Sequence, residues 1–453
     1  MTDSPLQGRA PGLGRWRCDA LACLLALGWG LTLPGASLAQ GSLPPAGMQH
    51  SLAQLLERAV SSHPSVQAKV AELGAGRATL EAAQWQAYPS LSLQSERAGN
   101  SGNAALPSNT ITNLRLQQTL WSGGRITAAV QNAEWKKRAA QHALQDARAT
   151  VGLRTLEAWQ GLLTAHGRQL ASTRLLAQLE QLDGMMARRI AQQISPAIDG
   201  QLLRARLAQA QSEQLSAVTA AEAARQRLVQ WVGPDALALL SSDTASLDLA
   251  EPLQPWPADT DQRLQRAIDR SPSLRRYDAD TAAVREELRQ REAEQWPTVY
   301  ARIERQFNSH APFLGKTVEN TVYLGLQYST GAGLSLRAQV VAAQARSQSL
   351  EDDRASLLRQ LRENYTSEWR DYQATVTRIG YAQSVQSSNS ALFESYTRLF
   401  VAGRRSWLEL LNALREQNAA DQSLTDLQAQ QQASHARLLL YLGAFAWQSE
   451  PAS

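Results

Sequence analysis

The sequence predicts a mainly α-helical fold with a small β part, built from two duplicated halves. Two motifs recur: His63-Pro64-Ser65-Val66 as Ser271-Pro272-Ser273-Leu274, and Tyr88-Pro89-Ser90 as Trp296-Pro297-Thr298. Both pairs are separated by the same 208 residues, so the repeated unit far exceeds the roughly 20–50 residues of a solenoid repeat. Long segments without proline and four short segments of alternating polarity complete the pattern.

Residues 1–39 are expected to be an export signal. A basic start precedes an apolar run over 20–33, and Ser37-Leu38-Ala39 supplies the small residues that a signal peptidase needs. The alternative, a membrane anchor, is disfavoured because the run is shorter than the ~20 residues of a spanning helix. Both cysteines, at positions 18 and 23, lie in this segment, so we expect a mature chain without disulfides.

Two segments without proline, residues 108–195 and 313–450, predict long helices. They are rich in Ala, Gln, Leu, Arg and Glu, which are strong helix formers. Residues 125–194 are long enough for one helix of roughly 100 Å, a length that suggests coiled-coil packing. A row of leucines recurs every seven residues (Leu156, Leu163, Leu170), which predicts side-by-side helices. The periodicity fits a solid bundle and a hollow barrel of helices equally well.

Four segments of alternating polarity predict strands, one pair within residues 89–120 and one within 297–330. Leu91 and Leu93 alternate with polar residues, as do Leu324 and Leu326. One apolar and one polar face is typical of a membrane barrel wall, although a half-buried soluble sheet has the same pattern. Four strands cannot close around a water-filled lumen, and lipid does not tolerate open sheet edges. A membrane-spanning form would therefore need several chains.

The charged residues indicate solvated helix faces. Arginine supplies 41 of the 45 basic residues and alternates with acids, for example in Arg285-Glu286-Glu287, which disfavours a nucleic-acid patch. The six histidines show no metal-ligand spacing, and Gly74-Ala75-Gly76 lacks the preceding strand of a dinucleotide site. The carboxylates are not gathered beside a nucleophile. We therefore expect no catalysis, no cofactor, no metal and no nucleic-acid partner.

The order of these features resembles the TolC-type outer-membrane efflux and secretion proteins (outer membrane factors), over essentially the whole mature sequence. Residues 118–125 (Gln-Thr-Leu-Trp-Ser-Gly-Gly-Arg) resemble the strand-to-helix junction of that family, and residues 400–413 resemble the tip of its second periplasmic helical hairpin. The resemblance implies a homotrimer. Three chains would contribute four strands each to one transmembrane β-barrel, which a long helical barrel would continue across the periplasm.

The resemblance also implies function, location and partners. The chain is expected to be a passive exit channel of a tripartite type I secretion or efflux system. It would lie in the cell outer membrane, contact lipid there and extend into the periplasm. Its partners would be a periplasmic adaptor (membrane fusion) protein and an inner-membrane ABC or proton-driven transporter. The first tip, Ser195-Pro196 followed by Asp199, favours type I secretion of large proteins.

Two alternatives stay open. One is an exported periplasmic coiled-coil adaptor or scaffold without a membrane barrel, which would explain the helices but not two strand pairs at equivalent places. The other is a polysaccharide-export channel, which has the same fold and differs only in its cargo.

The resemblance assigns candidate residues to the two hairpin tips. Five positions align with residues that close the periplasmic mouth or line it with acids: Gln201, Phe400, Arg405, Glu409 and Asn412. Three of them depart from the family, since Phe400 replaces a tyrosine and Gln201 and Asn412 replace acids. Asp199, one half-turn before Gln201, is the candidate that would replace the acid missing there. Adaptor docking is expected at Ser195, Pro196, Ala402, Gly403 and Arg404. Ser195 and Pro196 also fit a helix N-cap and first helical residue, which is a purely structural role.

The expected organisation has five parts: a signal (1–39), a first TolC-like repeat (40–233), a Pro-rich link (234–258), a second repeat (259–446) and a tail (447–453). The resemblance implies that the link and the chain ends form a small domain around the helical barrel.

Overall fold

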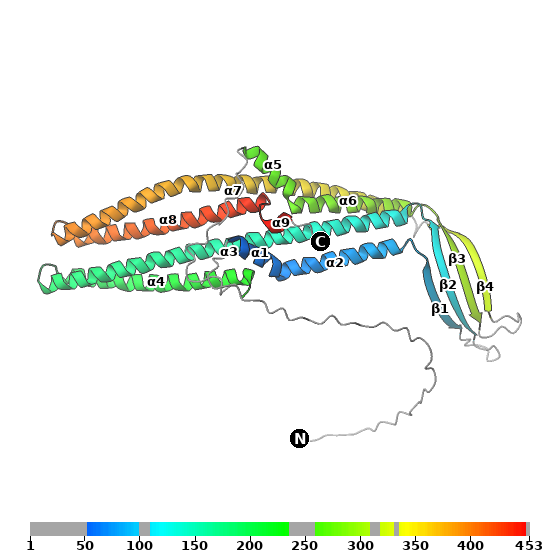
Figure 1. Cartoon of the computed structure of the whole chain (residues 1–453), viewed down its shortest axis with the longest axis horizontal. Coiled ribbons are helices and arrows are strands. Elements are labelled where there is room, and N and C mark those ends of the chain that lie inside the picture. The colour runs from blue at the N-terminus through cyan, green and yellow to red at the C-terminus, as the bar shows by residue number, and fades with distance from the viewer. Residues whose placement is uncertain (1–51, 99–108, 235–258, 309–317, 330–334, 450–453) are drawn as a thin grey trace, which may run out of the picture. The chain divides into compact units, whose positions relative to one another are not determined.

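The computed structural model describes five stretches of the chain: residues 52–98, 109–234, 259–308, 318–329 and 335–449 (Figure 1). They hold long helices and one four-stranded sheet, which confirms the predicted mainly α fold with a small β part. The predicted signal, the loops that contain Pro107 and Pro312, and nearly all of the predicted link lie outside the described residues. The elements are α1 (Leu52–Ser62), α2 (Pro64–Trp85), β1 (Ser90–Ala98), β2 (Asn109–Trp121), α3 (Arg125–Ala191), α4 (Ala197–Val232), α5 (Thr260–Arg270), α6 (Pro272–Ala293), β3 (Thr298–Asn308), β4 (Val318–Gln327), α7 (Ser335–Val401), α8 (Trp407–Tyr441) and α9 (Ala446–Ser449).

The elements of the first half recur in the second half with matched lengths. Helices α1 and α5 have 11 residues each, α2 and α6 have 22, α3 and α7 have 67, and α4 and α8 have 36 and 35. Pro64 and Pro272 each begin a helix, where the missing N–H of proline removes no hydrogen bond. The His63 and Ser271 side chains cap these helices by accepting from backbone N–H groups. The repeated motif is therefore a pair of equivalent helix starts.

Helix α3 is one continuous helix, as the sequence predicted, and at 67 residues it is about 100 Å long. It follows β2 through Gly123 and Gly124, both with positive φ, and a side chain at Gly123 would press against Trp296. The predicted leucine row drifts off the contact face, because a straight helix advances 3.6 residues per turn. Leu156 is fully buried, whereas Leu170 is 42% exposed.

The two long helices have different surroundings. Helix α3 packs against α2, α4, α6 and α8, whereas α7 packs mainly against α6 and α8. Figure 1 shows α4 running back along α3 and α8 running back along α7, so that each pair forms a hairpin whose tip lies far from the sheet. Of the 67 residues of α7, four are buried: Ala343, Tyr365, Thr375 and Phe400. The surface of α7 is therefore largely open in the single chain.

The largest core cluster of the described residues lies where α1, α4, α8 and α9 meet the middle of α3. Trp159 of α3 is fully buried there, together with Leu56 of α1 and Leu228 of α4. Trp447 of α9, in the predicted tail, joins the same cluster. The cluster also contains residues of α8, so it joins elements of both halves.

The four strands form one antiparallel sheet in the order β1-β2-β3-β4. The pairing aligns Leu91, Leu116, Ile303 and Val322 in one row across the sheet, on the same face. These four side chains are 42–75% exposed. The next row, Ser92, Arg115, Glu304 and Thr321, is polar and lies on the opposite face. The predicted alternation is thus confirmed, with its apolar face uncovered.

Within the described part of the chain, none of the helices combines the length and the apolar character needed to cross a bilayer.

Close packing of α3 on α8 predicts the effect of a single methyl group. Adding a Cβ at Gly167 would overlap Cγ2 of Thr425 on α8, so Gly167→Ala should lower the free energy of unfolding by about 1–3 kcal/mol. Gly184→Ala, on the same helix but in open space, should raise it by about 0.5–1 kcal/mol, since alanine favours helix. Denaturant unfolding of the purified protein checks both values.

The same contact offers a rescue. Thr425→Ser removes the overlapping methyl group and keeps the hydroxyl that donates to Asp421 O at 2.9 Å. We expect Gly167→Ala with Thr425→Ser to recover most of the lost stability. Equal stability of the Gly167→Ala and Gly184→Ala variants would contradict the described packing.

Candidate functional site

The two hairpin tips share one turn geometry. Ile194 N–H donates to Arg189 O, and Arg404 N–H donates to Leu399 O, both at 2.9 Å. Between each pair, one residue takes a positive φ: Gln193 at 58° and Gly403 at 71°. Such a conformation costs a non-glycine residue about 1–2 kcal/mol, so the first tip is the more strained of the two. The sequence marked Gly403 only as a docking residue and did not mark Gln193.

Ser195 and Pro196 differ from the predicted helix start. Helix α4 begins at Ala197, so Pro196 occupies the N-cap position, and no side chain caps this helix. The Ser195 hydroxyl instead accepts a hydrogen bond from Arg189 Nε at 3.1 Å. The N-cap prediction for Ser195 was therefore wrong, because a contact from the end of α3 takes up the hydroxyl.

Arg405 and Glu409 lie together at the start of α8. The Arg405 guanidinium donates to the Glu409 carboxylate at 2.6 Å and lies 4.8 Å from the centre of the Tyr396 ring. Ser406 and Glu409 form a reciprocal capping box, with bonds of 2.9 and 3.3 Å. The pKa of Glu409 lies below its ordinary value because Ser406 N–H, the Ser406 hydroxyl and Arg405 all donate to the carboxylate. At neutral pH this residue is therefore a fixed negative charge.

Phe400 is buried between the two hairpins. Its side chain is 4% exposed and packs on Trp407, with ring centroids 5.3 Å apart. The Arg189 guanidinium, at the end of α3, lies 4.7 Å from the centre of the Phe400 ring. Arg189 Nη1 also donates to Val401 O at 3.5 Å. Arg189 thus touches both tips, and no sequence motif marked it.

The other candidate residues do not meet these groups within one chain. Asp199 is half-buried in the first turn of α4, while Gln201 and Asn412 are exposed. Among the described residues, the Asp199 and Gln201 side chains form no bond with Arg405. Ala402, Gly403 and Arg404 are exposed at the second tip, and Pro196 is exposed at the first.

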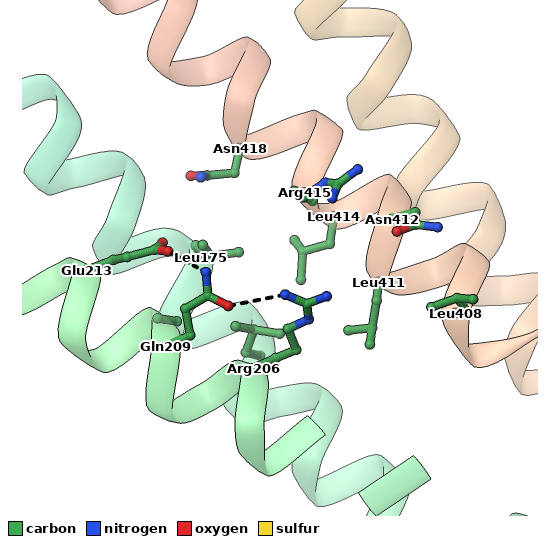
Figure 2. Close-up of a pocket in the computed structure, with 12 residues that line it drawn as sticks. Leu175, Arg206, Gln209, Glu213, Leu408, Leu411, Asn412, Leu414, Arg415 and Asn418 are labelled. Carbon is green, nitrogen blue, oxygen red and sulfur yellow. Dashed lines mark hydrogen bonds between the residues drawn. The ribbon is translucent and has the colours of Figure 1, made fainter. Parts of the chain in front are cut away.

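A pocket of about 140 Å³ separates the two hairpins a few turns from their tips (Figure 2). Leu175, Leu411 and Leu414 form the apolar part of its lining, and Asn412 is one of its polar lining residues. On the α4 side, Arg206 donates to Gln209 at 3.1 Å, and Gln209 donates to Glu213 at 2.9 Å. The two hairpins are therefore packed together by a buried core that leaves a small pocket a few turns behind the tips.

In the described part of the chain, no group of three or more His, Cys, Asp or Glu side chains is arranged to hold a metal ion.

Arg189 provides the first test of the site. Arg189→Ala removes the contacts with Ser195, Val401 and Phe400, so both tips should open more often. We expect amide hydrogen exchange in peptides covering 192–196 and 400–405 to become about fivefold faster, as for the loss of ~1 kcal/mol. Arg188→Ala is the matched control, because it removes an equal charge whose side chain forms no hydrogen bond or ion pair with the described residues. Equal exchange rates in both variants would contradict the link.

Glu409 predicts a pH dependence. Because its folded-state pKa is depressed, its contribution to the capping of α8 is fully present above its ordinary pKa of 4.5 and is lost as pH falls through the folded value. Exchange in residues 406–411, corrected for intrinsic rates, should therefore rise in acid. Glu409→Gln should abolish this acid step, whereas Glu416→Gln, at an exposed pair further along α8, should keep it. An unchanged acid step in Glu409→Gln would refute the assignment.

Comparisons with known proteins link this geometry to a fold. No protein-family model matches the sequence, and no curated protein matches it. Solved structures do match: the outer-membrane channel OprN has a TM-score of 0.75 at 19% identity, over 88% of this chain and 90% of that chain. CusC, described as forming a transmembrane channel, has a TM-score of 0.74 at 16% identity, over 87% and 92%. The outer membrane protein VceC from Vibrio cholerae has a TM-score of 0.71 at 18% identity, over 87% and 96%.

These similarities extend over nearly all of the described chain and over nearly all of each matched chain. Because 87–88% of this chain and 90–96% of each matched chain are covered, the similarities concern the whole architecture rather than a shared helical segment. The chain therefore has the outer membrane factor fold of these TolC-type channels, as the sequence resemblance indicated.

Proposed function

We propose that this protein is a passive outer-membrane channel, the exit duct of a tripartite transport system. The observation that carries the proposal is the sheet, whose apolar face is uncovered and whose two outer edges are free. Leu91, Leu93, Leu324 and Leu326 on that face are 66–77% exposed. Exposed leucines in this number would be costly in water but suit the lipid-facing wall of a barrel.

Aromatic side chains at the helical end of the sheet support the same placement. Trp85, Tyr88, Trp121, Trp296 and Tyr328 are 47–61% exposed where the strands join the helices. Exposed tryptophan and tyrosine are typical of the membrane–water interface. In the proposed orientation, this belt marks the periplasmic side of the outer membrane, and the helices extend away from it into the periplasm.

The free edges support assembly from several copies. Strands β1 and β4 are each paired on one side within the described sheet. In lipid, every backbone N–H and C=O must be bonded, so each edge needs a strand from another chain. We propose a homotrimer, because the fold is that of TolC-type channels. Exposed apolar residues on the long helices, including Leu215 (67%) and Tyr381 (71%), would then face neighbouring subunits.

The tips would be the periplasmic mouth of the duct. Asp199, Gln201, Phe400, Arg405, Glu409 and Asn412 are the proposed gate residues, and Asp199 would meet Arg405 between subunits rather than within one. A periplasmic adaptor would dock on Ser195, Pro196, Ala402, Gly403 and Arg404, and an inner-membrane ABC or proton-driven transporter would supply cargo. Such a duct needs no catalytic group. The resemblance of the first tip, Ser195-Pro196 followed by Asp199, to type I secretion members favours protein cargo over drugs in this proposal.

The membrane placement predicts opposite outcomes for two arginine substitutions. Leu324→Arg, on the apolar face, should cost about 2–4 kcal/mol if that face meets lipid, and should abolish assembly. Gln94→Arg, on the polar face beside Glu96, should be tolerated. The measurement is the amount of protein in the outer-membrane fraction that runs as a heat-sensitive oligomer near three times the monomer mass.

Two outcomes would contradict the proposal. One is equal recovery of both variants, as expected for a sheet surrounded by water. The other is a wild-type monomer in the soluble periplasmic fraction, which would favour the coiled-coil scaffold.

A further inference from the structure

The polar face of the sheet carries a cluster of charged side chains that the proposed duct does not by itself explain. Arg115 of β2 pairs in register with Glu304 of β3, and Arg302 lies two residues along the same strand. Nε of Arg115 and Nε of Arg302 each lie 3.4 Å from the same oxygen, Oε2 of Glu304. One carboxylate therefore neutralises one of two guanidinium groups, and the cluster keeps a net charge of one positive unit.

The cluster is well covered for a group on a sheet surface. The side chain of Glu304 is 13% exposed, that of Arg302 is 22% and that of Arg115 is 34%. The Arg302 guanidinium also lies 4.3 Å from the centre of the Tyr323 ring, on the neighbouring strand. One row closer to the helices, Tyr300 lies across Gly325, where a Cβ would overlap the tyrosine ring. Glycine at 325 thus leaves room for the Tyr300 ring to lie on the sheet beside the arginines.

The position of the cluster gives it a role in the proposed barrel, on which this inference rests. If the apolar face meets lipid, the polar face must line the lumen. The arginines then lie on the helical side of two other acids of that face, Glu319 of β4 and Glu96 of β1, which are nearer the loops. Fixed charges on the wall of a narrow channel attract ions of the opposite sign and repel ions of the same sign.

We propose that Arg115, Arg302 and Glu304 form an ion-selectivity site on the lumenal wall of the barrel, which favours anionic groups on the passing solute. Each subunit contributes one such site, so assembly places the sites in a ring. Glu304 sets the net charge of each site, because its carboxylate neutralises one arginine and leaves the positive charge of the other uncompensated. The site is distinct from the proposed gate, which lies at the opposite ends of the long helices.

The test uses the purified, full-length oligomer in planar bilayers under a potassium chloride gradient. The reversal potential gives the ratio of chloride to potassium permeability. We expect Glu304→Gln to raise this ratio about twofold or more, and Arg302→Gln to lower it by a similar factor. The contribution of the periplasmic mouth is the same in every variant and cancels in the comparison.

Arg305→Gln is the matched control. Arg305 neighbours the cluster in sequence but lies on the apolar face, in the row of Leu93 and Leu114, so its loss should leave the ratio unchanged. If Glu304→Gln does not assemble, Arg115→Gln and Arg302→Gln test the same site, and both should lower the ratio. Wild-type ratios in the cluster variants, with normal conductance, would overturn the selectivity site alone. A wild-type oligomer that conducts no ions would contradict the proposed duct as well.

Discussion

The sheet with an uncovered apolar face and two free edges is the constraint on which the rest of the structure depends. A protein in water would cover such a face with helices, as most small sheets are covered. Here α3 continues directly from β2, and the helices extend away from the sheet instead of folding over it (Figure 1). The positions of the strands therefore determine the positions of the helices that follow them. If copies close the sheet into a barrel, the helices that follow must also stand in a ring.

A ring of helices, as the proposed trimer requires, would explain why the two long helices are buried so differently. Helix α3 has neighbours on several sides within its own chain, whereas α7 leaves Val341, Val376, Tyr381, Val385 and Leu392 exposed. Two shallow pockets between α3 and α4 share the small residues Gly161, Ala165 and Ala220, which lie beside charged side chains such as Glu157. Small side chains let another helix approach closely. In the proposed trimer, the open side of one subunit would meet the side of the next that carries these pockets.

Features that follow local rules could be predicted from the sequence, and features that depend on distant contacts could not. Pro64 and Pro272 begin helices, and Leu324 and Leu326 alternate with polar residues, because proline chemistry and the strand repeat act over a few residues. Arg189 was missed because its partners, Val401 and Phe400, are more than 200 residues away. The alternating charges predicted solvated helix faces but not the contacts between helices. Arg437 of α8 donates to Glu368 of α7 and to Gln160 of α3, both at 2.9 Å, and so joins three helices.

The contacts at the tips suggest which bonds an opening motion would have to break. Arg405 lies in the turn before α8 and Glu409 in the first turn of α8, so their ion pair survives any rigid movement of the α7–α8 hairpin. Being exposed to water, the pair holds Arg405 weakly. In the proposed trimer, Arg405 would therefore exchange Glu409 for an acid of a neighbouring subunit at little cost. Arg189 differs, because its ring contact with Phe400 joins the first hairpin to the second. Separation of the hairpins within one chain must break that contact, so in the proposed channel part of the resistance to opening would lie inside each subunit.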